Sequence, residues 1–137
     1  MRRCTHTILI AEDDPDDQEL IAIAFAKADP SLKLFIVDDG QKALEYLQHS
    51  EDNRLPCLIL LDYNMPELNG AQVIQKIASD ERYQCIPKVI LSTSGNPLHA
   101  KDSFEKGASA YHVKPDNFGA LLDIAKEMAA LCHKAAA

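Results

Sequence analysis

Three carboxylates stand directly after short apolar runs, and their type and spacing could support metal-assisted chemistry. Asp62 follows the apolar residues 57–61, and Glu12 and Asp13 follow the run 7–11. A continuous apolar run of this length fits a strand covered on both faces, and parallel sheets of such strands bind ligands just beyond their carboxyl ends. Carboxylates that are packed together stay ionised most easily around a hard divalent cation, and Mg²⁺ fits best.

A hydroxyl group and an ammonium group end two later apolar runs. Ser92 and Thr93 follow residues 89–91, and Lys114 follows residues 110–113. An aspartate can act as a nucleophile that forms an aspartyl phosphate, and phosphoryl transfer mostly needs positioning and neutralisation of the phosphoryl oxygens. No Ser/His/Asp order, GxSxG elbow, P-loop or GxGxxG follows a predicted strand, which weakens the hydrolase, nucleotide triphosphatase and dinucleotide-binding interpretations.

The elements that must position these groups alternate along the chain. Each of five strand candidates is followed by one helical pattern. The strands are residues 7–11, 34–37, 57–61, 89–91 and 110–113, and the helices begin near Pro15, Gly40, Gly70, Pro97 and just after Asp116 or Asn117. This alternation predicts an α/β fold with a doubly wound, five-stranded parallel sheet of order 2-1-3-4-5 and helices on both faces. Right-handed crossovers then place the ends of strands 1 and 3 side by side.

Composition limits the remaining classes of protein. The 137 residues are 47% hydrophobic, which suits one domain with one sizeable core. No apolar run approaches the roughly 20 residues that cross a bilayer, so we expect a cytoplasmic protein without membrane contact. The net charge of −7 argues against nucleic acid as a partner. The four cysteines lie far apart, which predicts reduced thiols and no disulfide framework.

At these motifs the chain resembles the receiver domains of two-component response regulators, specifically the stand-alone, chemotaxis-receiver-like type with a flavodoxin-like (βα)5 fold. The resemblance covers residues 1–137 as one receiver domain with no output domain. It rests on Ile-Ala-Glu-Asp-Asp-Pro at 10–15, Leu-Asp-Tyr-Asn-Met-Pro at 61–66, Pro-Lys-Val-Ile-Leu-Ser at 87–92, Tyr111, and Val-Lys-Pro at 113–115.

The resemblance implies a role for each of these residues. Asp62 is the phosphoacceptor, which takes its phosphoryl group from a sensor histidine kinase or a histidine phosphotransfer protein. Mg²⁺ binds to Glu12, Asp13, Asp62 and the backbone carbonyl of Asn64, and the phosphate-binding and switch positions are Ser92, Thr93, Tyr111 and Lys114. The protein is then a signalling switch rather than an enzyme. Its readout surface is helix 4, strand 5 and helix 5, including Leu98 and Phe104, which bind a downstream protein or a second copy of the chain.

The chain departs from the commonest family pattern at three positions, and two rival functions stay open. Glu12 replaces the more usual Asp, Ser92 replaces Thr, and the bulk of Thr93 leaves the phosphoryl lifetime open. One rival is an aspartate-nucleophile phosphohydrolase, although Asn64 has no proton to give a leaving group. The other is an interaction module that works without phosphorylation.

Acidic residues and histidines outside these motifs receive plainer interpretations. Asp14, Asp16 and Asp17 are expected to act as helix N-terminal acids. The five histidines show no metal-ligand spacing and are interpreted as structural or surface residues.

Overall fold

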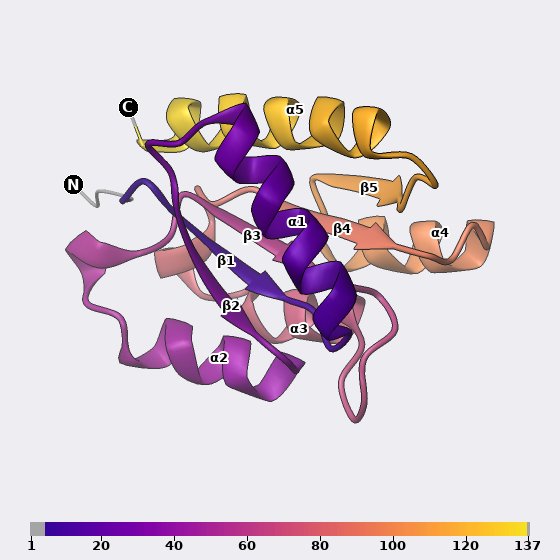
Figure 1. Ribbon diagram of the computed structural model, residues 1–137. Coiled ribbons are helices and arrows are strands. Elements are labelled where there is room, and N and C mark those ends of the chain that lie inside the picture. The colour runs from indigo at the N-terminus through magenta and orange to yellow at the C-terminus, as the bar shows by residue number, and fades with distance from the viewer. Residues whose placement is uncertain (1–4, 137) are drawn as a thin grey trace.

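Within residues 5–136, five parallel strands form one sheet in the order β2-β1-β3-β4-β5. The computed structural model describes residues 5–136, and Figure 1 shows the path of the chain. The strands are β1 (Thr7–Ala11), β2 (Lys33–Val37), β3 (Leu58–Leu61), β4 (Lys88–Ser92) and β5 (Ala110–Val113). The predicted strand order is confirmed, and each strand begins and ends within one residue of its predicted bound.

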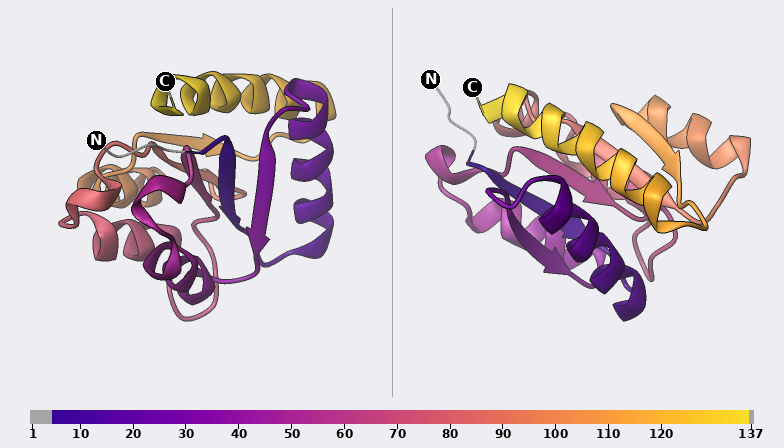
Figure 2. Two further views of the ribbon diagram at one scale, coloured as in Figure 1. Left: turned by 90° about the vertical axis from the view of Figure 1, so that its left-hand side faces the viewer. Right: turned by 45° about the horizontal axis from the view of Figure 1, so that its top comes forward.

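In the described part of the chain, five helices cover the two faces of this sheet. They are α1 (Pro15–Ala28), α2 (Gly40–His49), α3 (Gly70–Ile77), α4 (Pro97–Lys106) and α5 (Phe118–Ala136), with short 3-10 turns η1 (Asp52–Arg54) and η2 (Glu81–Tyr83). Figure 2 shows α1 and α5 on one face, and α2, α3 and α4 on the other. The predicted flavodoxin-like arrangement is therefore confirmed.

Local sequence signals explain where the helices begin and end. The Asp14 side chain caps α1 by accepting a hydrogen bond from the Asp16 N–H, and Pro15 suits the first helical position because it has no N–H to leave unpaired. Asn69 and Gln72 form a reciprocal capping box at α3. Gly107 ends α4 with a φ of 118°, a left-handed conformation that side chains disfavour.

The central strands are buried on both faces, and their side chains alternate between two apolar clusters. Leu9 and Ile59 point toward α2 and α3, whereas Ile8 and Leu58 point toward α1 and α5. Each such side chain contributes about 1.5–3 kcal/mol on burial. Since a shift of one residue would exchange the two faces of a strand, this packing fixes the register that places each strand end.

Gly70 holds α3 close against the end of β3. A Cβ atom added to Gly70 would lie 2.6 Å from the carbonyl oxygen of Asp62 and 2.7 Å from the Cδ1 atom of Ile90. Any residue with a Cβ atom at position 70 would clash with these two atoms. The start of α3 therefore packs directly against the backbone of Asp62.

The structure pairs Cys57, just before β3, with Cys132 of α5 in a disulfide, with Cα atoms 4.7 Å apart. The prediction of reduced thiols is wrong for this pair. The two residues are 75 positions apart, and their approach depends on how α5 crosses the start of β3. Cys85 is free and exposed, and Cys4 lies outside the described residues.

Across residues 5–136, the structure contains no helix with both the length and the apolar character needed to span a membrane.

Candidate functional site

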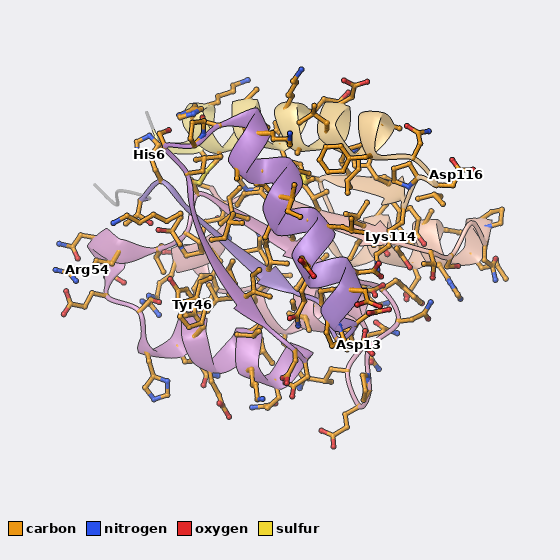
Figure 3. All side chains as sticks on the ribbon, in the orientation of Figure 1. His6, Asp13, Tyr46, Arg54, Lys114 and Asp116 are labelled. Carbon is orange, nitrogen blue, oxygen red and sulfur yellow. A yellow bond between two sulfur atoms is a disulfide. The ribbon has the colours of Figure 1, made fainter. Side chains whose placement is uncertain are left out.

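Main-chain hydrogen bonds hold two of the predicted site residues at the carboxyl edge of the sheet. The Asp62 N–H donates to the Ala11 carbonyl at 3.0 Å, and the Lys114 N–H donates to the Ser92 carbonyl at 2.7 Å. These bonds extend the strand pairing by one step, so each residue projects from the rim rather than from a mobile loop. Figure 3 labels Asp13 and Lys114 on this side of the molecule.

Glu12, Asp13 and Asp62 converge at this rim. One carboxylate oxygen from each residue lies within 4.8 Å of the others. Glu12 and Asp62 are buried at 2% and 7% exposure, whereas Asp13 is exposed. A set of three oxygen ligands with one open side is what a hard divalent cation accepts when it keeps part of its water shell. The predicted grouping of the three carboxylates is confirmed, and the group can hold a divalent metal.

Lys114 donates hydrogen bonds to two of these three carboxylates and to a further one, Asp17. Its Nζ atom donates to the Asp17 carboxylate at 2.8 Å, to Asp62 at 3.2 Å, and to Glu12 in a shorter contact. The Lys114 side chain is 11% exposed. The contact with Asp17 was missed from the sequence, because Asp17 was expected to act as a helix N-terminal acid alone.

Burial and charge shift the protonation equilibria of this cluster. Burial raises the pKa of Glu12 to about 7, and the charge of Asp62 adds to the rise, against the lowering effect of the hydrogen bond from Lys114. Burial by itself lowers the pKa of Lys114, but hydrogen bonds to Asp17 and Glu12 outweigh it and raise the pKa above its usual range. Lys114 therefore stays charged at neutral pH, while Glu12 exchanges its proton there.

In the presence of EDTA, we expect the free energy of unfolding to fall by about 2–3 kcal/mol between pH 5 and pH 8 through Glu12. The pKa of Glu12 is raised from 4.5 to about 7 in the folded chain, so the folded state binds the proton more tightly between these values. Stability that is present at low pH is therefore lost as the pH rises toward 7. Urea unfolding of wild type and Glu12→Gln across this range measures the effect, and equal slopes would contradict it.

Asn64 contacts the carboxylate group through its backbone. It is exposed, and its N–H donates to the Oδ1 atom of Asp62 at 3.2 Å. This bond orients one carboxylate oxygen of Asp62 toward the backbone of the loop that follows β3. The role of the Asn64 carbonyl as a metal ligand stays a prediction.

Ser94 links the hydroxyl side of the site to the rest of the molecule. Its N–H donates to the Oγ atom of the fully buried Ser92 at 3.2 Å, and its carbonyl accepts from the Tyr111 hydroxyl at 2.7 Å. Its own Oγ atom forms a 2.5 Å hydrogen bond with Nδ1 of His99 on α4. Thr93 is exposed beside this network, and its role stays a prediction.

Tyr63, the residue after Asp62, makes a second connection to α4. Its ring stacks on the His99 ring with centroids 4.2 Å apart and an interplanar angle of 15°. Its hydroxyl donates to the Asp102 carboxylate at 2.9 Å. Burial and Asp102 together raise the pKa of Tyr63 to about 12, so the hydroxyl remains a donor at neutral pH. Sequence reasoning missed this contact because no motif pairs positions 39 residues apart.

The architecture and the site define a parallel α/β protein with an acidic, lysine-containing pocket at its switch point. A family model for the response regulator receiver domain matches residues 8–126. The response regulator Rcp1 from Synechocystis sp. (strain ATCC 27184 / PCC 6803 / Kazusa) is 33% identical over 113 residues, which cover 80% of this chain and 77% of Rcp1.

Solved structures agree with this match. The phosphorylated cyanobacterial phytochrome response regulator RcpA superposes with a TM-score of 0.83 and 32% identity, covering 96% of each chain. The Mn²⁺-bound form of Rcp1 superposes with a TM-score of 0.77 and 30% identity, covering 89% of this chain and 90% of that one. This chain belongs to the family of response regulator receiver domains, which are signalling proteins of two-component systems.

Proposed function

We propose that Asp62 accepts a phosphoryl group from a phosphohistidine on a sensor histidine kinase or a histidine phosphotransfer protein. The observation that carries the proposal is the position of Asp62, which is buried between two acidic neighbours and a lysine at the sheet edge. A buried carboxylate with a charge partner and an open side suits an acceptor of a compact anion.

The transfer step needs in-line approach and charge neutralisation. An oxygen of Asp62 attacks phosphorus, the bond between phosphorus and the donor imidazole breaks, and the imidazole leaves with the electron pair and takes up a proton. Mg²⁺, bound by Glu12, Asp13, Asp62 and the Asn64 carbonyl, would neutralise the phosphoryl oxygens. Lys114 supplies a second positive charge near the phosphoryl group, because its ammonium lies 3.2 Å from Asp62.

Phosphorylation adds about 1.5–2 negative charges and new acceptor oxygens at Asp62. Ser92 then turns its hydroxyl toward the phosphoryl group and stops accepting from the Ser94 N–H. Since Ser94 also binds Tyr111 and His99, its movement reaches β5 and α4 together. The switch is a shift between two packings, which is limited by how much better the phosphoryl group contacts one of them.

The readout surface in this proposal is α4, β5 and α5. Leu98 and Phe104 on α4 are 69% and 51% exposed, and Val113 on β5 is 49% exposed. Apolar side chains of this size on adjoining elements suit a protein partner or a second copy of the chain. The partner that binds to this surface is a downstream protein or, in a homodimer, a second copy of the chain.

We expect His99→Phe to lower the beryllofluoride concentration that half-shifts α4 by about 2–5-fold. The variant keeps the stack on Tyr63 but loses the Ser94 hydrogen bond, which in this proposal belongs to the packing before phosphorylation and is worth about 0.5–1 kcal/mol. Amide NMR signals of α4 during the titration measure the change. Glu105→Gln is the control, because it alters an exposed α4 ion pair with Lys101. An unchanged midpoint in His99→Phe would contradict this role.

The proposed function is tested by mixing the protein with ³²P-labelled histidine kinases or phosphotransfer proteins in Mg²⁺. Transfer of label within seconds to minutes, blocked by EDTA, is expected. Steady release of phosphate from p-nitrophenyl phosphate without a donor protein would favour the phosphohydrolase instead. Beryllofluoride that leaves the α4 signals unchanged would favour an interaction module that works without phosphorylation.

A further inference from the structure

We propose that Asp17 is a positioning residue that keeps Lys114 in the site when a divalent cation takes Glu12 and Asp62. The inference rests on the proposed function, because it concerns the same lysine. It assigns a role to a residue on the first turn of α1 that stands outside the phosphorylation motifs.

The contacts of Lys114 show why such a residue is needed. Its ammonium divides three N–H donors among Glu12, Asp17 and Asp62. Glu12 and Asp62 are also two of the three carboxylates that could bind a metal, whereas Asp17 is outside that group. A cation that binds Glu12 and Asp62 therefore competes with Lys114 for both. Asp17 is the carboxylate partner that the ammonium keeps.

The position of Asp17 is built into the start of α1. Asp14 caps the helix, Pro15 fixes its first turn, and the side chain of Gln18 donates to the Glu12 carbonyl at 2.6 Å. The Asp17 side chain is 29% exposed, compared with 2% for Glu12 and 7% for Asp62. Asp17 thus lies in the first turn of α1, is more exposed than the two buried carboxylates, and contacts the lysine from outside the group that could bind a metal.

The expected result is that Asp17→Asn raises the dissociation constant for Mg²⁺ about fivefold. Without Asp17, Lys114 depends on Glu12 and Asp62, and a cation has to displace it from both. Coupling of this size is ordinary for contacting charged groups. Isothermal titration with MgCl₂ measures it. Asp16→Asn is the matched control, because it removes the same formal charge from an exposed neighbour in the same turn.

A double-mutant cycle separates positioning from simple loss of charge. In a Lys114→Met background, Asp17→Asn should change Mg²⁺ affinity by less than about twofold, since there is no ammonium left to hold. The ¹⁵Nζ signal of Lys114 provides a spectroscopic readout, and we expect it to persist with Mg²⁺ in wild type and Asp17→Glu but to broaden in Asp17→Asn. A fivefold effect in both backgrounds, or an unchanged ¹⁵Nζ signal in Asp17→Asn, would overturn the proposal.

Failure of this inference is distinguishable from failure of the proposed function. Mg²⁺ affinity and the Lys114 signal are measured without any phosphodonor. If wild type accepts no phosphoryl group but the cycle shows coupling, the proposed function fails and the role of Asp17 stands. If label is transferred and the cycle shows no coupling, Asp17 has no positioning role and the proposed function stands.

Discussion

Asp62→Asn is expected to abolish transfer of label from a phosphohistidine donor, with at least a 100-fold loss of rate, while the protein stays folded. The amide has nearly the same shape as the carboxylate and can still accept from the Asn64 N–H. It lacks the charged oxygen nucleophile that the transfer requires. Because removing one buried carboxylate relieves repulsion with Glu12, stability in EDTA should not decrease. Label transfer and thermal unfolding measure the two halves of this prediction.

Two further variants serve as comparisons for the labelling of Asp62→Asn. Asp13→Asn keeps Asp62 but replaces an exposed carboxylate of the group with a neutral amide, so transfer should become slower and need more Mg²⁺. Asp116→Asn removes an exposed charge from the turn after β5 and should label like wild type. Labelling of Asp62→Asn at the wild-type rate would show that phosphorylation occurs elsewhere.

The positions of the strands were predictable because a parallel sheet that is covered on both faces requires apolar residues along each central strand. Residues 57–61 are apolar and buried, and the change to the charged Asp62 marks the carboxyl end of β3. The helix ends were similarly predictable from Pro15, which suits a first turn, and from Gly107, whose φ of 118° ends α4. These ends depend on residues close to them in the sequence, so the sequence alone is enough to predict them.

The contacts that sequence reasoning missed are long-range and depend on side-chain direction. Asp17 meets Lys114 across 97 positions, and the Tyr63 ring meets His99 on α4. In each case several rotamers are compatible with the backbone, and the choice follows from packing that a single sequence does not display. The Cys57–Cys132 pairing belongs to the same class, because it requires knowing which end of α5 crosses β3.

Lys114→Met should cost about 3–5 kcal/mol of unfolding free energy in EDTA at pH 8. The substitution keeps much of the apolar stem but removes the ammonium, so Glu12 and Asp62 are left buried without the charge that pairs with them. Removing one partner of a buried pair is costly because the other charge stays desolvated. Chemical denaturation of wild type and variant at matched ionic strength gives the difference directly.

Two changes in conditions, a lower pH and the addition of Mg²⁺, should restore part of the stability that Lys114→Met loses, because both act on Glu12 and Asp62. Burial and the charge of Asp62 already raise the pKa of Glu12 to about 7 with Lys114 present, and losing the ammonium raises it further. At pH 6 Glu12 is then protonated in the folded variant, so the deficit should shrink to about half. Mg²⁺ should also stabilise the variant more than wild type, because it replaces the missing positive charge without competing against a lysine. A deficit that is equal at pH 6 and pH 8 and unaffected by Mg²⁺ would mean that Lys114 supports the fold through packing alone.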